Sequence, residues 1–272
     1  MPKTSYHQFP KWLLNNPYFI YLFYWWNDLV FQRNWILWPK LHKALRCLPS
    51  GATICDAGAG EGHHLIRLAK KYPNLHFIGI DLLPSNIEML EALKKHYKIR
   101  NLKLVEGNLE MRLPFKANFI YCIGVLQYIH NDQNALNHLA DNLQNKGCIF
   151  VYSPVNDIIK WGFYKRAREN WPHYELSQNR QRVYNSDLLN RLFKESKLKV
   201  LTEEKHIGYF GIWAHEFYST LFLNLQFGHV LLKPFWGIGI IILLPIISLL
   251  KLIDMNSKKE PCNAIFFELI KE

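Results

Sequence analysis

Three glycines at alternate positions mark the stretch Cys55-Asp56-Ala57-Gly58-Ala59-Gly60-Glu61-Gly62. It follows a short apolar run, residues 53–55, and precedes a pattern typical of a helix from Gly62 to about Lys71. Glycines at alternate positions allow a sharp turn and let a ligand approach the backbone closely. The first turn of a helix presents free N–H groups to an acceptor. The stretch therefore predicts a strand, a ligand-binding turn and a helix, in that order.

An acidic residue, Asp81, ends the next apolar run, residues 76–80. A carboxylate at the end of this strand can accept hydrogen bonds from both hydroxyls of a ribose. The glycine spacing, Gly58-x-Gly60-x-Gly62, is one residue shorter than the G-x-G-x-x-G of dinucleotide enzymes. The alternative is an ordinary tight turn and a helix-capping aspartate. That alternative does not explain why the glycine turn is followed by an acidic residue at the end of the next strand. Asp81 and the glycine spacing together predict a ribose-containing ligand that is not a dinucleotide.

Short apolar runs alternate with helical patterns after residue 49, which is typical of a parallel sheet covered on both faces. Strands are expected at about residues 53–55, 76–81, 102–105, 118–123, 148–152, 197–205 and 263–270. Helices are expected at about 62–71, 84–98 and 132–144, and from Ser186, a predicted N-cap. The predicted organisation is an aromatic helical cap (1–48), a core (49–207) with an insertion at about 154–185, an apolar helical hairpin (208–262) and a last core strand (263–272).

The composition narrows the possible partners. In 272 residues, Lys and Arg number 33 and Asp and Glu 22, a net charge of +11. This excess suggests attraction to anionic lipid, nucleic acid or acidic substrates. The five cysteines form no C-x-x-C pair, and their odd number fits no closed disulfide framework, so buried reduced thiols are expected. No metal-binding motif is evident, and no metal is expected.

The motifs together resemble those of the class I S-adenosylmethionine-dependent methyltransferases of the small-molecule or lipid type, over about residues 45–155. The resemblance implies a Rossmann-like α/β fold, with helices on both faces of a seven-stranded sheet whose last strand is antiparallel and inserts beside the fifth. It also implies S-adenosylmethionine as the cofactor. By their place in the motifs, the residues implied to bind it are Asp56, Gly58, Gly60, Gly62, Asp81, Leu82, Asn108 and Gly124.

Some of these positions depart from the family's pattern. Asp81 matches the family's ribose-binding acid, and Leu82 its apolar residue against the adenine. Asn108 stands where the family usually has an aspartate that contacts the adenine amino group. Asn118 and Tyr128 replace the aspartate and the histidine of the family's fourth-strand motif.

Methyl transfer needs in-line approach of a nucleophile to the methyl carbon, and an oxygen or nitrogen nucleophile must lose a proton. Tyr128 and His130 follow the fourth strand, near the expected position of the methyl group, and are the candidate catalytic residues. His215 is a further candidate base. For each, packing or a solvated loop position is the alternative.

No charge occurs between Lys233 and Lys251, a run of roughly 17 residues that is near the lower limit for a membrane span. A single crossing would leave the last strand on the wrong side of the membrane. A re-entrant or interfacial hairpin formed with residues 212–232 avoids this and predicts a cytoplasmic, peripheral or monotopic protein. A soluble lid or a dimer interface is the alternative, and the oligomeric state stays open.

The predicted reaction is methyl transfer to an oxygen, or to a carbon or nitrogen, of an apolar or membrane-resident small molecule or lipid. A nucleic-acid methyltransferase is one alternative, although no Asn/Asp-Pro-Pro-Tyr-like motif follows the fourth strand. An inactive membrane-bound adaptor that kept the fold is the other.

Overall fold

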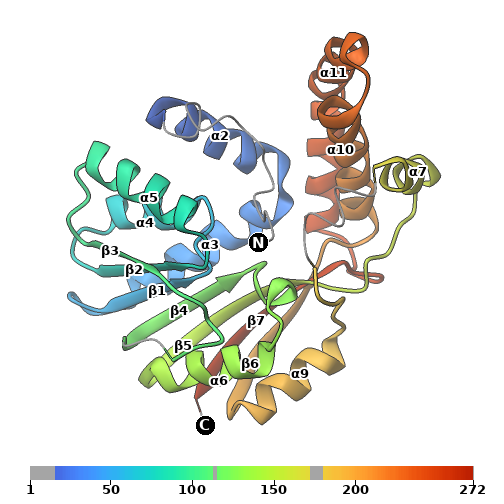
Figure 1. Ribbon diagram of the computed structural model, residues 1–272. Helices are drawn as coiled ribbons and strands as arrows, with labels where there is room; N and C mark the ends of the chain where they lie inside the picture. The colour runs from blue at the N-terminus through green and yellow to red at the C-terminus, as the bar shows by residue number, and fades with distance from the viewer. Residues whose placement is uncertain (1–15, 113–114, 172–179, 272) are drawn as a thin grey trace.

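A seven-stranded sheet forms the centre of the computed structural model, which describes residues 16–112, 115–171 and 180–271 (Figure 1). The strand order is β3-β2-β1-β4-β5-β7-β6. β7 is antiparallel to both β5 and β6, while β1 to β5 pair in parallel. The Rossmann-like sheet, with its antiparallel last strand beside the fifth, is confirmed. The strands are β1 (Thr53–Ala57), β2 (His76–Asp81), β3 (Leu102–Glu106), β4 (Ala117–Ile123), β5 (Leu143–Pro154), β6 (Leu198–His206) and β7 (Ala264–Lys271).

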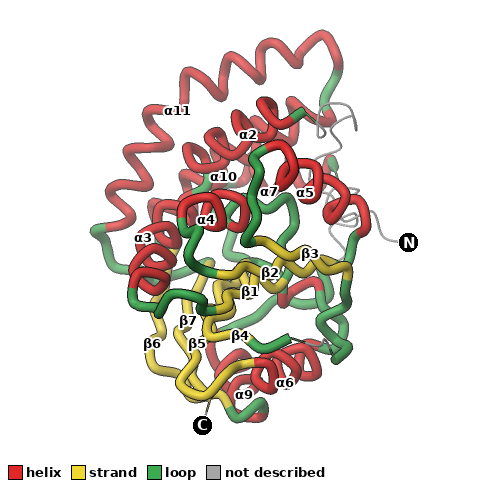
Figure 2. The backbone as a smooth tube through the Cα atoms, turned by 90° about the vertical axis from the view of Figure 1, so that its left-hand side faces the viewer, coloured by secondary structure: helices red, strands yellow, loops and turns green. Residues whose placement is uncertain are grey.

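Helices cover both faces of the sheet, as Figure 2 shows from the side. One face packs against α2 (Pro17–Val30), α3 (Gln32–Arg46), α4 (Leu65–Lys71) and α5 (Pro84–His96). The other face packs against α6 (Asp132–Asn142) and α9 (Ser186–Glu195). Successive residues of a strand point to opposite faces, so Phe119 of β4 belongs to the first core and Ile120 to the second. Strands buried on both faces explain the continuous apolar runs in the sequence.

Three local predictions need correction. The helix after the glycine turn begins at Leu65 rather than at Gly62, because Gly62 N–H still donates to the carbonyl of Ala59 in a turn. The N-cap of α9 is Asn185 rather than Ser186, since the Asn185 side chain accepts from Leu188 N–H at 2.8 Å. Cys47 is exposed, whereas the other four cysteines are buried or half-buried.

A helical hairpin stands away from the sheet beside α2 (Figure 1). It consists of α10 (Tyr209–Phe227), the short turn η2 (Val230–Leu232) and α11 (Lys233–Met255). α7 (Gly162–Asn170) packs beside α10. Among the described residues, one helical segment, Val230–Met255, is long and apolar enough to cross a membrane. Residues 1–15 of the predicted cap and 172–179 of the predicted insertion lie outside the described residues.

Candidate functional site

The glycine turn joins β1 to α4 at the carboxyl edge of the sheet. Gly58 and Ala59 N–H groups donate to the carbonyl of Ile80 at 2.9 and 2.8 Å, which fixes the turn against β2. Gly58, Gly60 and Gly62 have φ angles of 90°, 53° and 72°, a left-handed region that favours glycine.

The three glycines face different surroundings. A Cβ on Gly58 would lie 2.5 Å from Val125 Cγ2, and one on Gly62 would lie 2.2 Å from Leu90 Cδ2. A Cβ on Gly60 would meet nothing within 4 Å. Gly58 and Gly62 therefore hold the turn against its neighbours, whereas Gly60 borders open space.

Asp81 ends β2 directly beside this turn and is 9% exposed. Its Oδ2 accepts from Gly60 N–H at 2.7 Å, and its Oδ1 accepts from Leu83 N–H and Asn86 Nδ2, both at 2.9 Å. A carboxylate has about four acceptor sites, so the group keeps capacity for a further donor. Leu82, the next residue, is 60% exposed.

Asp56 lies at the end of β1 and is 5% exposed. Burial raises the pKa of its carboxyl group to about 8, and the nearby charge of Asp81 adds to this rise, while Tyr121 opposes it. The Asp56 carboxyl group is therefore largely neutral at pH 7 and can donate as well as accept a hydrogen bond.

The ends of β3 and β4 complete this edge. Gly107 N–H donates to the carbonyl of Asp81 at 2.9 Å, and Asn108 Oδ1 accepts from Glu110 N–H at 2.9 Å. Gly124 follows β4 with a φ of 65°, and its N–H donates to the carbonyl of Tyr152 at 2.7 Å. The fold thus brings the eight predicted cofactor residues to the carboxyl ends of four neighbouring strands, the usual place for a ligand in an open α/β sheet.

The candidate catalytic residues follow β4 as well. Tyr128 ends the short helix η1 (Leu126–Tyr128) and is half-buried. His130 is exposed; its N–H donates to Glu110 Oε1 at 3.0 Å, and its carbonyl accepts from Arg182 Nη2 at 2.6 Å. The backbone of His130 is therefore fixed while its ring faces solvent.

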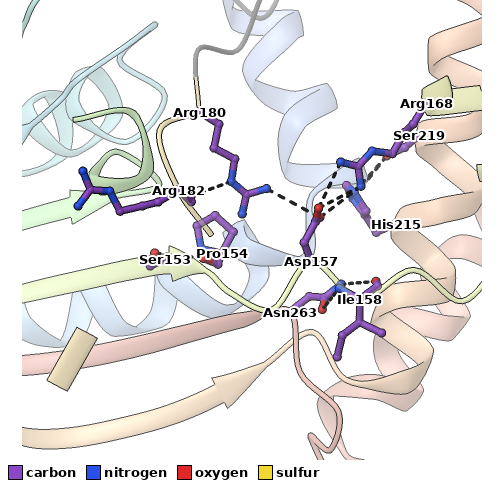
Figure 3. A network of polar contacts seen from close by, with 10 residues as sticks. All are labelled: Ser153, Pro154, Asp157, Ile158, Arg168, Arg180, Arg182, His215, Ser219 and Asn263. Carbon is purple, nitrogen blue, oxygen red and sulfur yellow. Dashed lines mark hydrogen bonds and ion pairs between the residues drawn. The ribbon is translucent and has the colours of Figure 1, made fainter. Parts of the chain in front are cut away.

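His215 lies elsewhere, on α10, in a polar cluster near the end of β5 (Figure 3). Asp157 holds Arg168 through both guanidinium ends at 3.2–3.3 Å and lies 3.8 Å from Arg180. His215 keeps exposed surface, but the surrounding protein desolvates the ring and lowers its pKa to about 4, with Asp157 opposing the shift. The ring is neutral at pH 7.

The N-terminal helices contact the glycine turn directly, which the sequence analysis did not anticipate. The Tyr24 hydroxyl donates to the carbonyl of Glu61. Asp28 accepts from Trp38 Nε1 at 2.8 Å, lies 2.8 Å from His63 Nε2 and pairs with Arg67. Burial alone would raise the pKa of Asp28, but hydrogen bonds from His63 and Trp38 hold it below its usual value. The sequence signal for these contacts is Asp28 itself, an acidic residue within an otherwise aromatic and apolar stretch.

Comparisons with known proteins identify the family of the chain. A family model described as a methyltransferase domain matches residues 48–209, more than half of the chain. The carboxy-S-adenosyl-L-methionine synthase of Campylobacter jejuni is 23% identical over 151 residues, which cover 52% of this chain and 63% of the synthase. An uncharacterized protein of Rickettsia prowazekii is 27% identical over 150 residues, which cover 53% of this chain and 60% of that protein. The chain thus spans less than two thirds of the length of these relatives.

Solved structures share the fold at low identity. Coclaurine N-methyltransferase bound to N-methylheliamine and S-adenosylhomocysteine (SAH) has a TM-score of 0.58 at 13% identity, over 87% of this chain and 72% of that one. An O-methyltransferase of a Brevibacillus brevis polyketide synthase, in complex with SAH, has a TM-score of 0.55 at 14% identity, over 81% and 66%. With the matched family model and the site at the carboxyl edge of the sheet, the chain belongs to the methyltransferase-domain family of class I, S-adenosylmethionine-dependent methyltransferases.

Proposed function

We propose that this protein transfers a methyl group from S-adenosylmethionine to an oxygen, carbon or nitrogen of an apolar or amphipathic small molecule taken from a membrane surface. The observation that carries the membrane part of the proposal is the outer face of α11. Its exposed apolar side chains recur at three- and four-residue intervals and form one continuous stripe along the helix: Phe235, Ile238, Ile241, Ile242, Ile246, Leu249, Leu252 and Ile253.

The charges near the end of α11 do not interrupt this stripe. Lys251 is 2% exposed, and its Nζ donates to the carbonyl of Leu29 at 2.7 Å. Asp254 is fully buried and accepts from Gln32 Nε2 at 2.7 Å. Both groups point toward the cap and leave the outer face apolar. An exposed apolar surface of this length is typical of a membrane or protein contact.

The connections of the hairpin favour an interfacial arrangement over a span. α10 follows β6 and α11 precedes β7, and these strands are neighbours whose ends pair at His206 and Ala264. Both ends of the hairpin therefore return to one edge of the same sheet. A helix pair with this topology can lie in the headgroup region without crossing the bilayer.

The carboxyl edge of the sheet fits the cofactor. We assign Asp81 to the ribose hydroxyls, Leu82 to the adenine face, and Asn108 to the adenine amino group. Gly60 provides the open space that a side chain would fill. When bound, the cofactor supplies an electrophilic methyl group on a sulfonium.

The chain's own residues would hold and activate the acceptor. Tyr128 and His130 remain the proposed groups that accept or relay its proton, because they follow β4 at this edge. His215, neutral and on the hairpin, is a third candidate. No specific feature of the described residues favours nucleic-acid methylation or an inactive adaptor.

The membrane part is tested by flotation with phosphatidylcholine–phosphatidylglycerol vesicles. The wild-type protein is expected to float, to resist release by high salt and to be released by detergent. Replacing Ile242 and Leu249 together by glutamate should abolish flotation, whereas Leu201→Glu, at an exposed apolar position on β6, should not. Wild-type protein that stays at the bottom of the gradient would refute the membrane contact.

The reaction is tested with methyl-tritiated S-adenosylmethionine and a lipid extract. Label that enters the organic phase only with active protein supports the proposal, and mass spectrometry of that phase identifies the acceptor. Label that enters added RNA or DNA instead would contradict it.

A further inference from the structure

Arg33 lies in the first turn of α3 and reaches the carboxyl edge of the sheet. A Cβ built on Gly124, at the end of β4, would lie 3.7 Å from Arg33 Nη1. The guanidinium also lies 5.2 Å from the centre of the Phe31 ring. Nothing in the sequence of the N-terminal cap sets Arg33 apart from its other basic residues.

Arg33 is half-buried, and its Nε is buried without a hydrogen-bond acceptor. No carboxylate among the described residues pairs with it. Other arginines of this region have such partners: Arg67 pairs with Asp28, Arg168 with Asp157 and Arg182 with Asp132. A guanidinium remains charged at every accessible pH and carries five donors. Leaving the buried Nε–H without an acceptor is costly, so the position favours an anion that the chain itself does not supply.

A second nitrogen donor, Gln127 Nε2, lies near the same point at the end of β4. A Cβ on Gly124 would also lie 3.9 Å from Gln127 Nε2. The charge of Arg33 acts on His64 and on His215, although His215 belongs to the separate cluster on α10. Burial is the main cause of the lowered pKa values of both histidine rings, and the positive charge of Arg33 lowers them further. Both rings are therefore neutral at pH 7 and add no positive charge beside Arg33.

We propose that Arg33 docks the carboxylate of a molecule bound at this site, through the paired N–H groups of its guanidinium. The inference rests on the proposed cofactor site, and it adds a binding residue from the N-terminal cap. Two sources present this chemistry at the end of β4: the methionine part of the cofactor and an acidic acceptor. A planar guanidinium and a carboxylate form two parallel hydrogen bonds, about twice as strong as neutral ones.

The test compares wild type, Arg33→Gln, Arg33→Lys and Arg46→Gln by calorimetry. Arg46 is the matched control because it is exposed in the last turn of the same helix. The first pair of probes is SAH, which carries the carboxylate, and 5′-methylthioadenosine, which lacks it. The second pair, added to SAH-saturated protein, is decanoate and decanol.

Arg33→Gln should weaken binding of a carboxylate probe by about tenfold or more while changing its uncharged counterpart by less than about twofold. The affinity of Arg33→Lys for a carboxylate probe should lie between those of the wild type and Arg33→Gln, because lysine keeps the charge but lacks the paired N–H groups. A selective loss for SAH assigns the cofactor as the source, and one for decanoate assigns the acceptor.

Two results would overturn the inference. One is that Arg33→Gln binds every probe as the wild type does. The other is that both Arg33 variants unfold at clearly lower temperature and bind methylthioadenosine more weakly, which would mark Arg33 as structural. If the wild-type protein binds neither SAH nor methylthioadenosine, the proposed cofactor site fails together with the inference.

Discussion

The hydroxyl of Tyr24, on α2, donates a hydrogen bond to the carbonyl oxygen of Glu61, inside the glycine turn. The two residues are 37 positions apart, and Tyr24 is 1% exposed. Tyr24 O also lies 3.5 Å from where a Cβ of Gly62 would be. The N-terminal cap therefore supports the backbone that lines the cofactor site.

Tyr24→Phe removes this hydrogen bond and keeps the ring. A net hydrogen bond contributes about 0.5–1.5 kcal/mol, so SAH affinity should fall by roughly two- to tenfold. Calorimetry measures the change, and Tyr18→Phe, on the same helix but 77% exposed, is the control. Equal affinities for Tyr24→Phe and the wild type would show that the turn keeps its shape without the cap.

The glycines of the turn should separate folding from binding. Gly60→Ala should reduce SAH affinity with a loss of about 1–2 kcal/mol in the free energy of unfolding, the cost of a left-handed residue. Gly51→Ala should show the same loss of stability without the loss of affinity. Gly51 has a φ of 81°, and a Cβ there would meet nothing within 4 Å, as at Gly60, but Gly51 lies outside the candidate site.

Gly62→Ala should destabilise more than either, since its Cβ would also clash with Leu90. Denaturant unfolding and calorimetry on the three variants check the order. A Gly60→Ala variant that binds as tightly as Gly51→Ala would contradict the assignment of the open space to a ligand.

Asp56 should make the stability of the ligand-free protein depend on pH. Burial raises its pKa in the folded state from 3.8 to about 8, so the neutral form is favoured on folding. The free energy of unfolding should therefore fall as pH rises from about 4 to about 8, by about 1.4 kcal/mol for each unit of pKa at most. Asp56→Asn cannot ionise and should lose this dependence.

Denaturation midpoints at pH 5, 6.5 and 8 measure the effect. Asp141→Asn, at an exposed position on α6, is the control and should keep the wild-type profile. Parallel profiles for Asp56→Asn and the wild type would show that Asp56 is ionised throughout this range.

Tyr128 and His130 should differ in their effect on turnover. General acid–base catalysis contributes about 10²–10⁴-fold, so Tyr128→Phe or His130→Ala should lower kcat by about that factor if the residue accepts the proton of the acceptor. SAH affinity should stay unchanged in both. Turnover measured on the identified acceptor decides between them, and full activity in both variants removes both from the mechanism.

The sheet, and the place of the candidate cofactor residues at its carboxyl edge, were predictable because their signals are local. The glycine spacing and Asp81 lie within 30 residues of one another, and the apolar strand runs report burial on both faces. The contacts of Tyr24, Asp28 and Arg33 were not predictable, because each joins the cap to a turn or strand end far along the chain. The start of α4 differs from its predicted place by three residues, because the turn at Gly62 continues the helical pattern.

Calorimetric titration of the wild type and Asp81→Ala with SAH shows whether the carboxyl edge of the sheet binds the cofactor and whether Asp81 holds its ribose. The wild type should bind one SAH per chain, and Asp81→Ala should lose roughly 1.5–3 kcal/mol of binding free energy, about 10- to 150-fold in affinity. Thermal unfolding of both ligand-free proteins controls for the loss of the bonds from Gly60, Leu83 and Asn86. Equal affinity for a folded Asp81→Ala, or no binding by the wild type, would contradict the account.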